Sequence, residues 1–307
     1  MATESPVFVV GLARSGTSAL RTTLSALPAF ASAGPRLPET RVFTQPDRIH
    51  DVFERRGRRL YTYLLRDTAA AQRMLVTLHD LPDPAGWRRL LLRRVRGADR
   101  SAMLRGLAWR LSRRHHLVRI FFHAAREARG CQRILEKTPH HVLHLPEVFA
   151  TFPRAKVILC MRHPVDGYAS LRKRLERDRK AGRNPHRLRW MEVTPAEYAE
   201  RYRVIAGIVS RRLRRPGRSR LLRYEDLTAD PHAALRELCD FVGEAFDEDR
   251  LLRGRPVERA ESGFFVKGSR ITASESAWRR FVTEEEARGL EDELAPAMGL
   301  LGYARHT

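Results

Sequence analysis

Short apolar runs alternate with amphipathic stretches along the chain, and this alternation predicts strands interleaved with helices. Three runs are predicted as buried strands: residues 6–11, 156–161 and 221–227. The first two are followed by predicted helices, over residues 19–27 and about 165–177. Strands that alternate with helices predict an α/β fold of three layers with a mainly parallel sheet.

Helix-end signals mark further helices toward the C-terminus. Thr228 and Asp230 are candidate N-caps for a helix that ends at Gly243, and Thr283 opens the last helix with a capping box. Residues 46–129 are helical in pattern. We expect a single domain over residues 1–307, in which this segment is a helical insertion that shapes the acceptor pocket.

Several classes of protein are excluded by simple counts. No apolar run approaches the roughly 18 residues that a membrane span needs, and the N-terminal segment lacks the pattern of a signal peptide. Three cysteines are too few for a disulfide framework or a zinc site. We therefore expect a cytoplasmic protein without a membrane span.

The charge is the unusual feature of the composition. Lys+Arg is 58 against 36 for Asp+Glu, a net charge of +22. Such a charge favours anionic partners, namely nucleic acid, an acidic metabolite or an anionic surface. Only five of the basic residues are lysine, a skew that codon bias alone also produces. The charge by itself therefore identifies no partner.

Residues 11–18 have the pattern of a phosphate-binding loop between a strand and a helix. The two glycines, Gly11 and Gly16, have the spacing of the nucleotide-triphosphatase loop, but Thr17 stands where that loop has lysine. The only cation in the loop is Arg14, and no predicted strand ends in a carboxylate that would hold magnesium. The segment therefore predicts phosphate binding without a metal.

Two other segments carry candidate chemistry. Arg162 follows a buried strand, and Ser170 and Arg174 lie on one face of the next predicted helix, a set suited to a second phosphate. Lys137 follows an apolar pair and precedes a proline, a position from which it would polarise a leaving oxygen. His140 and His141 are adjacent and point in different directions, so they form no metal pair.

Taken in order, these segments resemble the sulfotransferases that use 3′-phosphoadenosine-5′-phosphosulfate (PAPS), most of all a bacterial branch similar to tyrosylprotein sulfotransferases. The matching segments are residues 14–18, 38–43, 136–139, Arg162 with Ser170, and 223–227. The resemblance covers about residues 6–45 and 130–305. It implies a sulfuryl transfer from PAPS to a hydroxyl or amine acceptor, with 3′-phosphoadenosine-5′-phosphate (PAP) as product and no metal.

The resemblance also implies roles for individual residues. It implies that the phosphosulfate is bound by the loop of Arg14, Ser15, Gly16, Thr17 and Ser18. The 3′-phosphate would be bound by Arg162, Ser170 and Arg174. Tyr224 would contact the adenine, and the loop over residues 262–271, with Lys267 and Gly268, would close over the nucleotide. Glu39 matches the general base of the tyrosylprotein branch, and Lys137 the residue that stabilises the departing oxygen.

The general base stays open between two residues. In the small-molecule branch a histidine sits two residues after the lysine, where this chain has Pro139, and His140 is the nearest substitute. The acceptor also stays open among acidic, carrier-bound and lipid-linked molecules. Two other functions compete with this interpretation, a metal-dependent phosphate-loop kinase and a non-catalytic nucleic-acid-binding protein. Against the latter, the basic clusters lack interleaved aromatic residues, so we expect no specific nucleic-acid partner.

Overall fold

The computed structural model describes residues 5–30, 39–44, 113–214, 217–252 and 278–306. Its strands are β1 Val7–Gly11, β2 Leu135–Lys137, β3 Lys156–Met161 and β4 Ser219–Arg223. Its α-helices are α1 Thr17–Leu24, α6 Arg113–Arg129, α7 Leu145–Thr151, α8 Pro164–Lys180, α9 Pro195–Leu213, α10 Tyr224–Ala229, α11 Pro231–Val242, α12 Glu248–Leu252 and α13 Glu284–Leu301. Short 3₁₀ helices include η2, Pro139–His144.

The four strands form one sheet in the order β2-β1-β3-β4. Strands β3 and β4 are parallel, with Val157 opposite Ser219 and Met161 opposite Arg223. Every residue of β1 is buried, as its unbroken apolar sequence predicts. The predicted α/β fold with a mainly parallel sheet is therefore confirmed.

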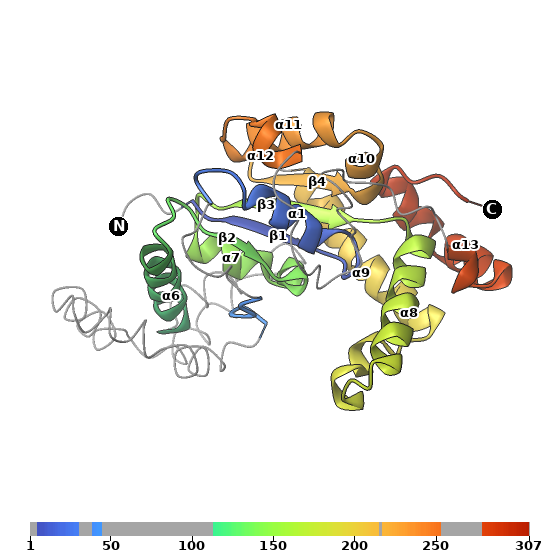
Figure 1. Cartoon of the computed structure of the whole chain (residues 1–307). Helices are drawn as coiled ribbons and strands as arrows, with labels where there is room; N and C mark the ends of the chain where they lie inside the picture. Colours follow the sequence, from blue (N-terminus) through green and yellow to red (C-terminus); the bar gives the residue numbers. More distant parts are fainter. Residues whose placement is uncertain (1–4, 31–38, 45–112, 215–216, 253–277, 307) are drawn as a thin grey trace, which may run out of the picture. The chain divides into compact units, whose positions relative to one another are not determined.

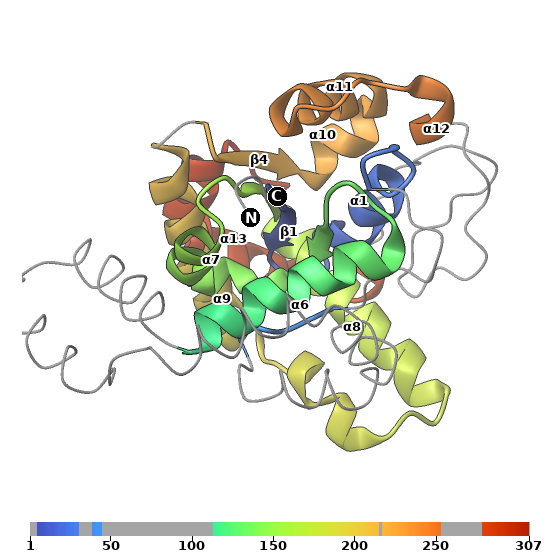
Figure 2. The same cartoon turned by 90° about the vertical axis from the view of Figure 1, so that its left-hand side faces the viewer.

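The described residues divide into two compact units. Among the described residues, the first unit contains 5–8, 28–30, 39–44 and 113–156, and the second contains 9–27, 157–214, 217–252 and 278–306. In the first unit, α6 lies alongside α7 (Figure 2), and Phe122 and Phe152 pack with ring centroids 4.9 Å apart. In the second unit, α11 and α12 lie on one side of β4 and α9 on the other, while α13 packs on α9 (Figure 1).

Most predicted elements are present, with shifts at their ends. Helix α1 begins two residues before the predicted start, because Gly16 already serves as its N-cap. The predicted strand 221–227 is wrong in its second half: β4 ends at Arg223, and Tyr224 begins α10. Two acidic residues in the first turn of α10 favour this helix start.

Capping chemistry was read correctly at two other helices. The Asp230 carboxylate accepts from the amide of Ala233 at 2.9 Å, and Gly243 ends α11 in a left-handed conformation. Thr283 and Glu286 form the predicted capping box of α13. Of the predicted insertion 46–129, only α6 lies within the described residues. Among the described helices, none is both long and apolar enough to cross a membrane.

Candidate active site

The loop between β1 and α1 depends on two glycines with positive φ. Gly11 has φ 138°, and a Cβ atom there would lie 2.0 Å from the carbonyl oxygen of Cys160. Gly16, at φ 79°, caps α1, whose first amides have no partner within the helix. Arg14 adopts φ 75°, a left-handed conformation that costs a non-glycine residue about 1–2 kcal/mol. Strain of this kind is typical of ligand-binding loops.

Arg14 belongs to a group of four arginines in the second unit, which we call the arginine cluster: Arg14, Arg162, Arg174 and Arg177. Arg14 Nε donates to Ser170 Oγ at 3.3 Å. Burial, followed by repulsion from Arg174 and Arg162, lowers the pKa of Arg14 to about 10. The structure therefore brings together Arg14, Arg162, Ser170 and Arg174, which the sequence analysis assigned to two different phosphate groups. The resulting field strongly favours an anion.

A buried carboxylate that the sequence analysis did not single out compensates part of this charge. Asp178 Oδ2 accepts from Arg174 Nε at 2.6 Å, and Asp178 Oδ1 lies 3.5 Å from Arg177 Nε. Burial alone would raise the pKa of Asp178, but the hydrogen bond from Arg174 and the neighbouring guanidinium charges hold it below its usual range. The spacing of four residues between Arg174 and Asp178 on α8 was the signal available in the sequence.

Arg162 is buried at the end of β3, with 8% of its surface exposed. Its guanidinium lies 4.1 Å from the ring centroid of Tyr224, the first residue of α10. Within the described residues, Arg162 Nε and Ser15 Oγ are buried and have no hydrogen-bond partner. A buried donor without an acceptor is costly, so these atoms fit the oxygens of an anionic ligand.

The residue after Arg162 is anchored by the C-terminal segment of the second unit. His163 Nε2 donates to the carbonyl oxygen of Ala304 at 3.0 Å, and the His163 amide donates to Glu225 Oε1 at 2.9 Å. Burial, together with the charge of His306, lowers the pKa of His163 to about 4. The backbone that presents Arg162 is thereby held from two sides.

His163, Asp166 and His306 are the group of residue types nearest to a metal site in the described residues. Their arrangement is accounted for without an ion. His306 Nε2 donates to Asp166 Oδ2 at 2.9 Å, and the imidazole rings of His163 and His306 are tilted by 35° with centroids 3.7 Å apart. His163 Nε2 donates to the carbonyl oxygen of Ala304.

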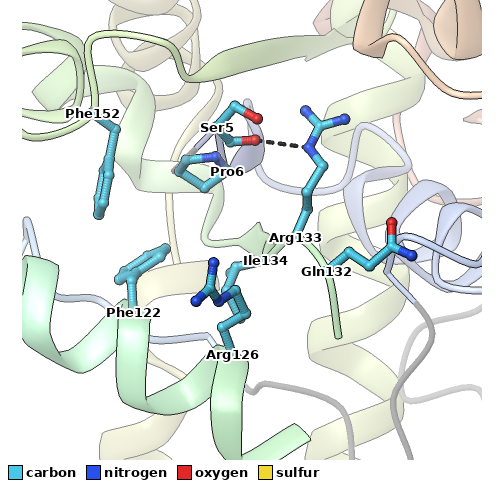
Figure 3. A pocket seen from close by; sticks show the side chains of 8 residues that line it. All are labelled: Ser5, Pro6, Phe122, Arg126, Gln132, Arg133, Ile134 and Phe152. Carbon is cyan, nitrogen blue, oxygen red and sulfur yellow. Dashed lines mark hydrogen bonds between the residues drawn. The ribbon is translucent and has the colours of Figure 1, made fainter. Parts of the chain in front are cut away.

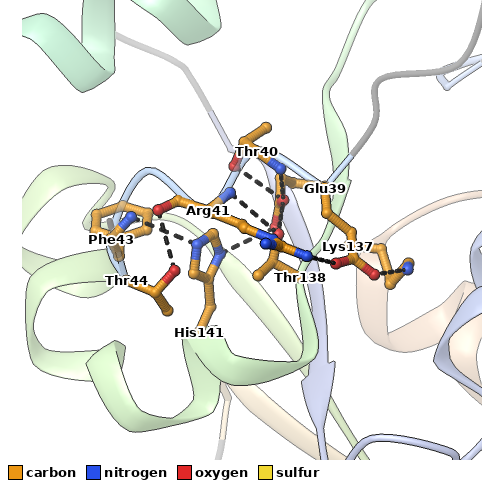
Figure 4. A network of polar contacts seen from close by, with 9 residues as sticks. Glu39, Thr40, Arg41, Phe43, Thr44, Lys137, Thr138 and His141 are labelled. Atoms are coloured by element: carbon orange, nitrogen blue, oxygen red, sulfur yellow. Dashed lines mark hydrogen bonds and ion pairs between the residues drawn. The ribbon is translucent and has the colours of Figure 1, made fainter. Parts of the chain in front are cut away.

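In the first unit, Glu39 and Lys137 form an ion pair (Figure 4). Lys137 ends β2 and is 6% exposed, whereas the Glu39 side chain is 34% exposed. Arg41 Nη2 lies 3.6 Å from the second carboxylate oxygen of Glu39. An ammonium and a carboxylate in contact, one buried and one open to solvent, are suited to proton transfer with a ligand.

The neighbouring histidines differ sharply in environment. His140 is exposed in η2, whereas His141 is completely buried and its Nδ1 donates to Glu136 Oε2 at 3.1 Å. The sequence analysis singled out neither Glu136 nor His141 for a role. Their spacing of five residues across the strand end gave no periodic signal.

Two predicted site residues lie outside the described part of the chain, Lys267 and Gly268. Thr17 and Ser18 lie in the first turn of α1, whereas the sequence analysis placed them in the loop before a helix that starts at residue 19.

A separate pocket lies in the first unit around Ser5 and Pro6, just before β1 (Figure 3). Its volume of about 20 Å³ holds a single water molecule. Arg133 Nε donates across it to the carbonyl oxygen of Ser5 at 3.0 Å. Ligands of parallel sheets bind at the carboxyl ends of strands, and this pocket lies at the opposite end of β1.

The sequence is similar to known proteins of one family. The sequence model of the "Sulfotransferase family" matches residues 6–248. A stretch of 91 residues is 36% identical to carbohydrate sulfotransferase 7 of Mus musculus, covering 27% of this chain and 18% of that protein. A stretch of 89 residues is 30% identical to carbohydrate sulfotransferase 2 of Homo sapiens, covering 28% of this chain and 17% of that protein. The chain thus matches less than a fifth of the length of these relatives.

Solved structures show the same fold. The sulfotransferase domain of the Synechococcus PCC 7002 olefin synthase aligns with a TM-score of 0.54 at 21% identity, covering 99% of this chain and 98% of that one. The sulfotransferase domain from the curacin biosynthetic pathway aligns with a TM-score of 0.54 at 18% identity, covering 99% and 100%. At these identities the likeness concerns the fold alone.

Proposed function

The chain belongs to the sulfotransferase family, and we propose that it transfers a sulfuryl group from PAPS to a hydroxyl-bearing acceptor. The observation that carries the proposal is the arginine cluster around a strained phosphate loop, with buried donors at Ser15 and Arg162 that lack acceptors among the described residues. Neither competing function, a kinase or a nucleic-acid-binding protein, is supported by the family match.

PAPS, the proposed sulfuryl donor, carries anionic groups at both ends, and the second unit has hydrogen-bond donors for both groups. In this proposal the loop of Arg14 to Ser18 binds the 5′-phosphosulfate, and Arg162, Ser170 and Arg174 bind the 3′-phosphate. Two observations support one site for both anionic groups of PAPS. Arg14 donates a hydrogen bond to Ser170, and the charges of Arg162 and Arg174 lower the pKa of Arg14. Lys267 and Gly268 are proposed to contribute to the closing loop.

Tyr224 has a more specific part in this proposal. Its buried ring lies against the guanidinium of Arg162, so it supports that side chain in addition to any contact with the adenine. A cation held over an aromatic face keeps its edge free for hydrogen bonds to an anion. Arg162 is thus ready to receive the 3′-phosphate.

When bound, PAPS supplies the sulfuryl group, whose bond to the bridging phosphate oxygen breaks as the acceptor oxygen bonds to sulfur. Glu39 takes the proton of the acceptor hydroxyl on a carboxylate oxygen. Lys137 Nζ donates to the bridging oxygen, which keeps the electron pair of the broken bond. Arg14 and the loop amides stabilise the charge on the sulfuryl and phosphate oxygens, the role that a metal has in phosphoryl transfer.

Glu39 is the preferred base over His140 because of its contacts. Glu39 is paired with the buried Lys137 and remains partly open to solvent, whereas His140 is exposed in η2. A base, Glu39, in contact with an acid, Lys137, suits a single step in which a proton leaves the acceptor hydroxyl while negative charge grows on the bridging oxygen.

The acceptor is proposed to be a hydroxyl compound, with amines as a secondary class. Carbohydrate hydroxyls are the first to test, since the partial matches are to carbohydrate sulfotransferases. Acidic, carrier-bound and lipid-linked hydroxyl compounds complete the panel. Cytoplasmic location, bacterial origin and a single domain stay predictions from the sequence.

The decisive experiment is transfer from PAPS labelled with ³⁵S to this panel, with 4-methylphenol as a simple phenol probe. We expect labelled product and stoichiometric PAP with wild-type protein, and none with Lys137→Met. Binding of PAP without transfer to any member would leave the donor assignment standing and reject the acceptor class. Absence of PAP binding would reject the proposed donor.

A further inference from the structure

Glu136 lies between Leu135 and Lys137 in β2 and is completely buried. Side chains of a strand alternate in direction, so Glu136 points away from the side to which Lys137 points. A buried carboxylate is costly unless hydrogen bonds and opposite charge compensate it. An apolar residue at this buried strand position would stabilise the fold without that cost, so the presence of a carboxylate needs an explanation.

The described hydrogen bonds of Glu136 lead to Thr40 in the segment that carries Glu39, to Thr138 directly after β2, and to His141 in η2. Oε1 accepts from the Thr40 amide at 3.2 Å, from Thr40 Oγ1 at 3.0 Å and from Thr138 Oγ1 at 2.6 Å. Oε2 accepts from His141 Nδ1 at 3.1 Å. Burial alone would raise the pKa of Glu136, but His141 and these hydrogen bonds hold it below its usual range.

His141 extends the network to the far end of the same segment. Its Nδ1 donates to a carboxylate, so its Nε2 is free to accept, and the amide of Phe43 lies 3.5 Å from it. The imidazole also packs edge-on against the Phe43 ring, with centroids 5.0 Å apart. One buried pair therefore holds the segment at both Thr40 and Phe43.

The held segment is strained between these two points. Arg41 adopts φ 53°, in the left-handed region, and its amide donates to Thr138 Oγ1 at 3.4 Å. A non-glycine residue keeps such a conformation only where the surroundings determine it. The result is a short bridge in which Glu39, directly before Thr40, meets Lys137, directly after Glu136.

We propose that Glu136, with His141, is a positioning residue for sulfuryl transfer, holding the carboxylate of Glu39 in contact with Lys137. The inference rests on the proposed function and deepens it, since it explains how a base on a loop is kept in place. Glu136 itself touches neither substrate. Displacements of about 1 Å in such groups typically lower rates by up to about a hundredfold.

The test compares Glu136→Gln, Thr40→Val and a control, Thr151→Val. The glutamine keeps the size of the side chain but has only one accepting oxygen. In one orientation its NH₂ group faces the imidazole N–H of His141, and in the other it faces the donors of Thr40, so one set of hydrogen bonds is lost in either case. Thr40→Val removes one hydroxyl donor and leaves the carboxylate in place. Thr151 is also buried in the same unit, and its hydroxyl donates to the carbonyl oxygen of Glu147 in its own helix at 2.8 Å.

Two readouts are needed, hydrogen exchange of the 39–44 segment and steady-state transfer from labelled PAPS to 4-methylphenol. We expect Glu136→Gln to speed exchange in this segment at least tenfold and to lower kcat ten- to hundredfold, with the KM for PAPS unchanged. Thr40→Val should speed exchange and lower kcat by three- to tenfold each, also with the KM for PAPS unchanged. Thr151→Val should lower the melting temperature without either change.

The outcomes separate the inference from the function on which it rests. Unchanged exchange in a folded Glu136→Gln protein, or faster exchange with unchanged kcat, would overturn the positioning role. If Glu136→Gln does not fold, Thr40→Val decides by the same criteria. If the wild-type protein transfers label to no acceptor of the panel, while exchange of the 39–44 segment is faster in Glu136→Gln than in the wild type, the proposed acceptor class is rejected and the structural link stays intact.

Discussion

The charged groups around Glu39 and Glu136 in the first unit are paired, whereas the guanidinium groups of the arginine cluster in the second unit outnumber the carboxylates described near them. Glu39 is paired with Lys137 and Arg41, and Glu136 with His141. In the arginine cluster, Asp178 pairs with Arg174 and Arg177, and Glu225 attracts Arg162, while Arg14 is repelled by the other three guanidinium groups. The first arrangement balances its own charges, and the second keeps an excess of positive charge that suits an anion.

This difference distinguishes a site that positions catalytic groups from a site that attracts a charged ligand. A matched network fixes geometry in advance, so its loss should appear in the rate of the chemical step. An unmatched cluster stores repulsion that an anion relieves, so its loss should appear in binding. The following experiments test that separation, beginning with the largest expected effect.

Glu39→Gln should lower kcat by roughly 10²–10⁴, the usual consequence of removing a general base, and leave PAP affinity nearly unchanged. Steady-state kinetics with labelled PAPS and calorimetry with PAP measure the two quantities. His140→Asn is the matched control and should cost far less. An inactive His140→Asn beside an active Glu39→Gln would reverse the assignment of the base.

Arg162→Ala should weaken PAP binding about ten- to hundredfold, since hydrogen bonds to charged groups contribute about 1.5–3 kcal/mol. Wild-type protein should prefer PAP to ADP, which lacks the 3′-phosphate, and the variant should lose that preference. Calorimetry with both nucleotides measures this. Arg172→Ala serves as the control, because Arg172 lies on the same helix but pairs with Glu286 at 2.8 Å. Equal affinity of wild-type protein for PAP and ADP would refute the 3′-phosphate site.

The pH dependence of stability should be smaller and should reflect His163, which follows Arg162. The pKa of His163 is lowered to about 4 by burial, while an unfolded chain takes up this proton near about 6.5. The unfolded state therefore binds more protons below pH 6.5, and this residue costs stability as the pH falls from about 6.5 to about 4.

Urea unfolding at pH 7 and pH 5 measures this effect. The wild type should lose more stability on acidification than His163→Asn does. His306 should act in the opposite direction. Its hydrogen bond to Asp166 raises the pKa of His306, so its contribution is present below about pH 6.5 and is lost as the pH rises through the raised value. Equal acid losses in wild type and His163→Asn would contradict the assignment.

The smallest expected effect is that of removing divalent metals. In the proposed mechanism the arginine cluster provides the positive charge that magnesium provides in phosphoryl transfer, so a chelator should leave transfer from PAPS unchanged. The assay is turnover with and without chelator, followed by added magnesium. Loss of activity that magnesium restores would move the assignment to the kinase class.

Local signals accounted for most of the fold. The apolar run 156–161 became β3 with its predicted bounds, and the capping residues Asp230 and Thr283 began the predicted helices. The strand beyond Arg223 was wrong because apolar periodicity does not separate a strand from the short helix that follows it. The pairing of Arg174 with Asp178 was visible in spacing but was not singled out among so many arginines.

Spacing along the chain was sufficient to predict a strand, a loop and a helix at the N-terminus, Arg162 directly after a strand, and Lys137 at the end of another. These features depend on residues that are neighbours in the sequence. The folded structure was needed to show that Glu39 contacts Lys137, that His141 rather than His140 is buried, and that Glu136 accepts from Thr40, 96 positions away in the sequence. Such contacts join segments far apart in the chain, and burial, which determines whether a carboxylate or an imidazole is charged and bonded, exists only once the chain has folded.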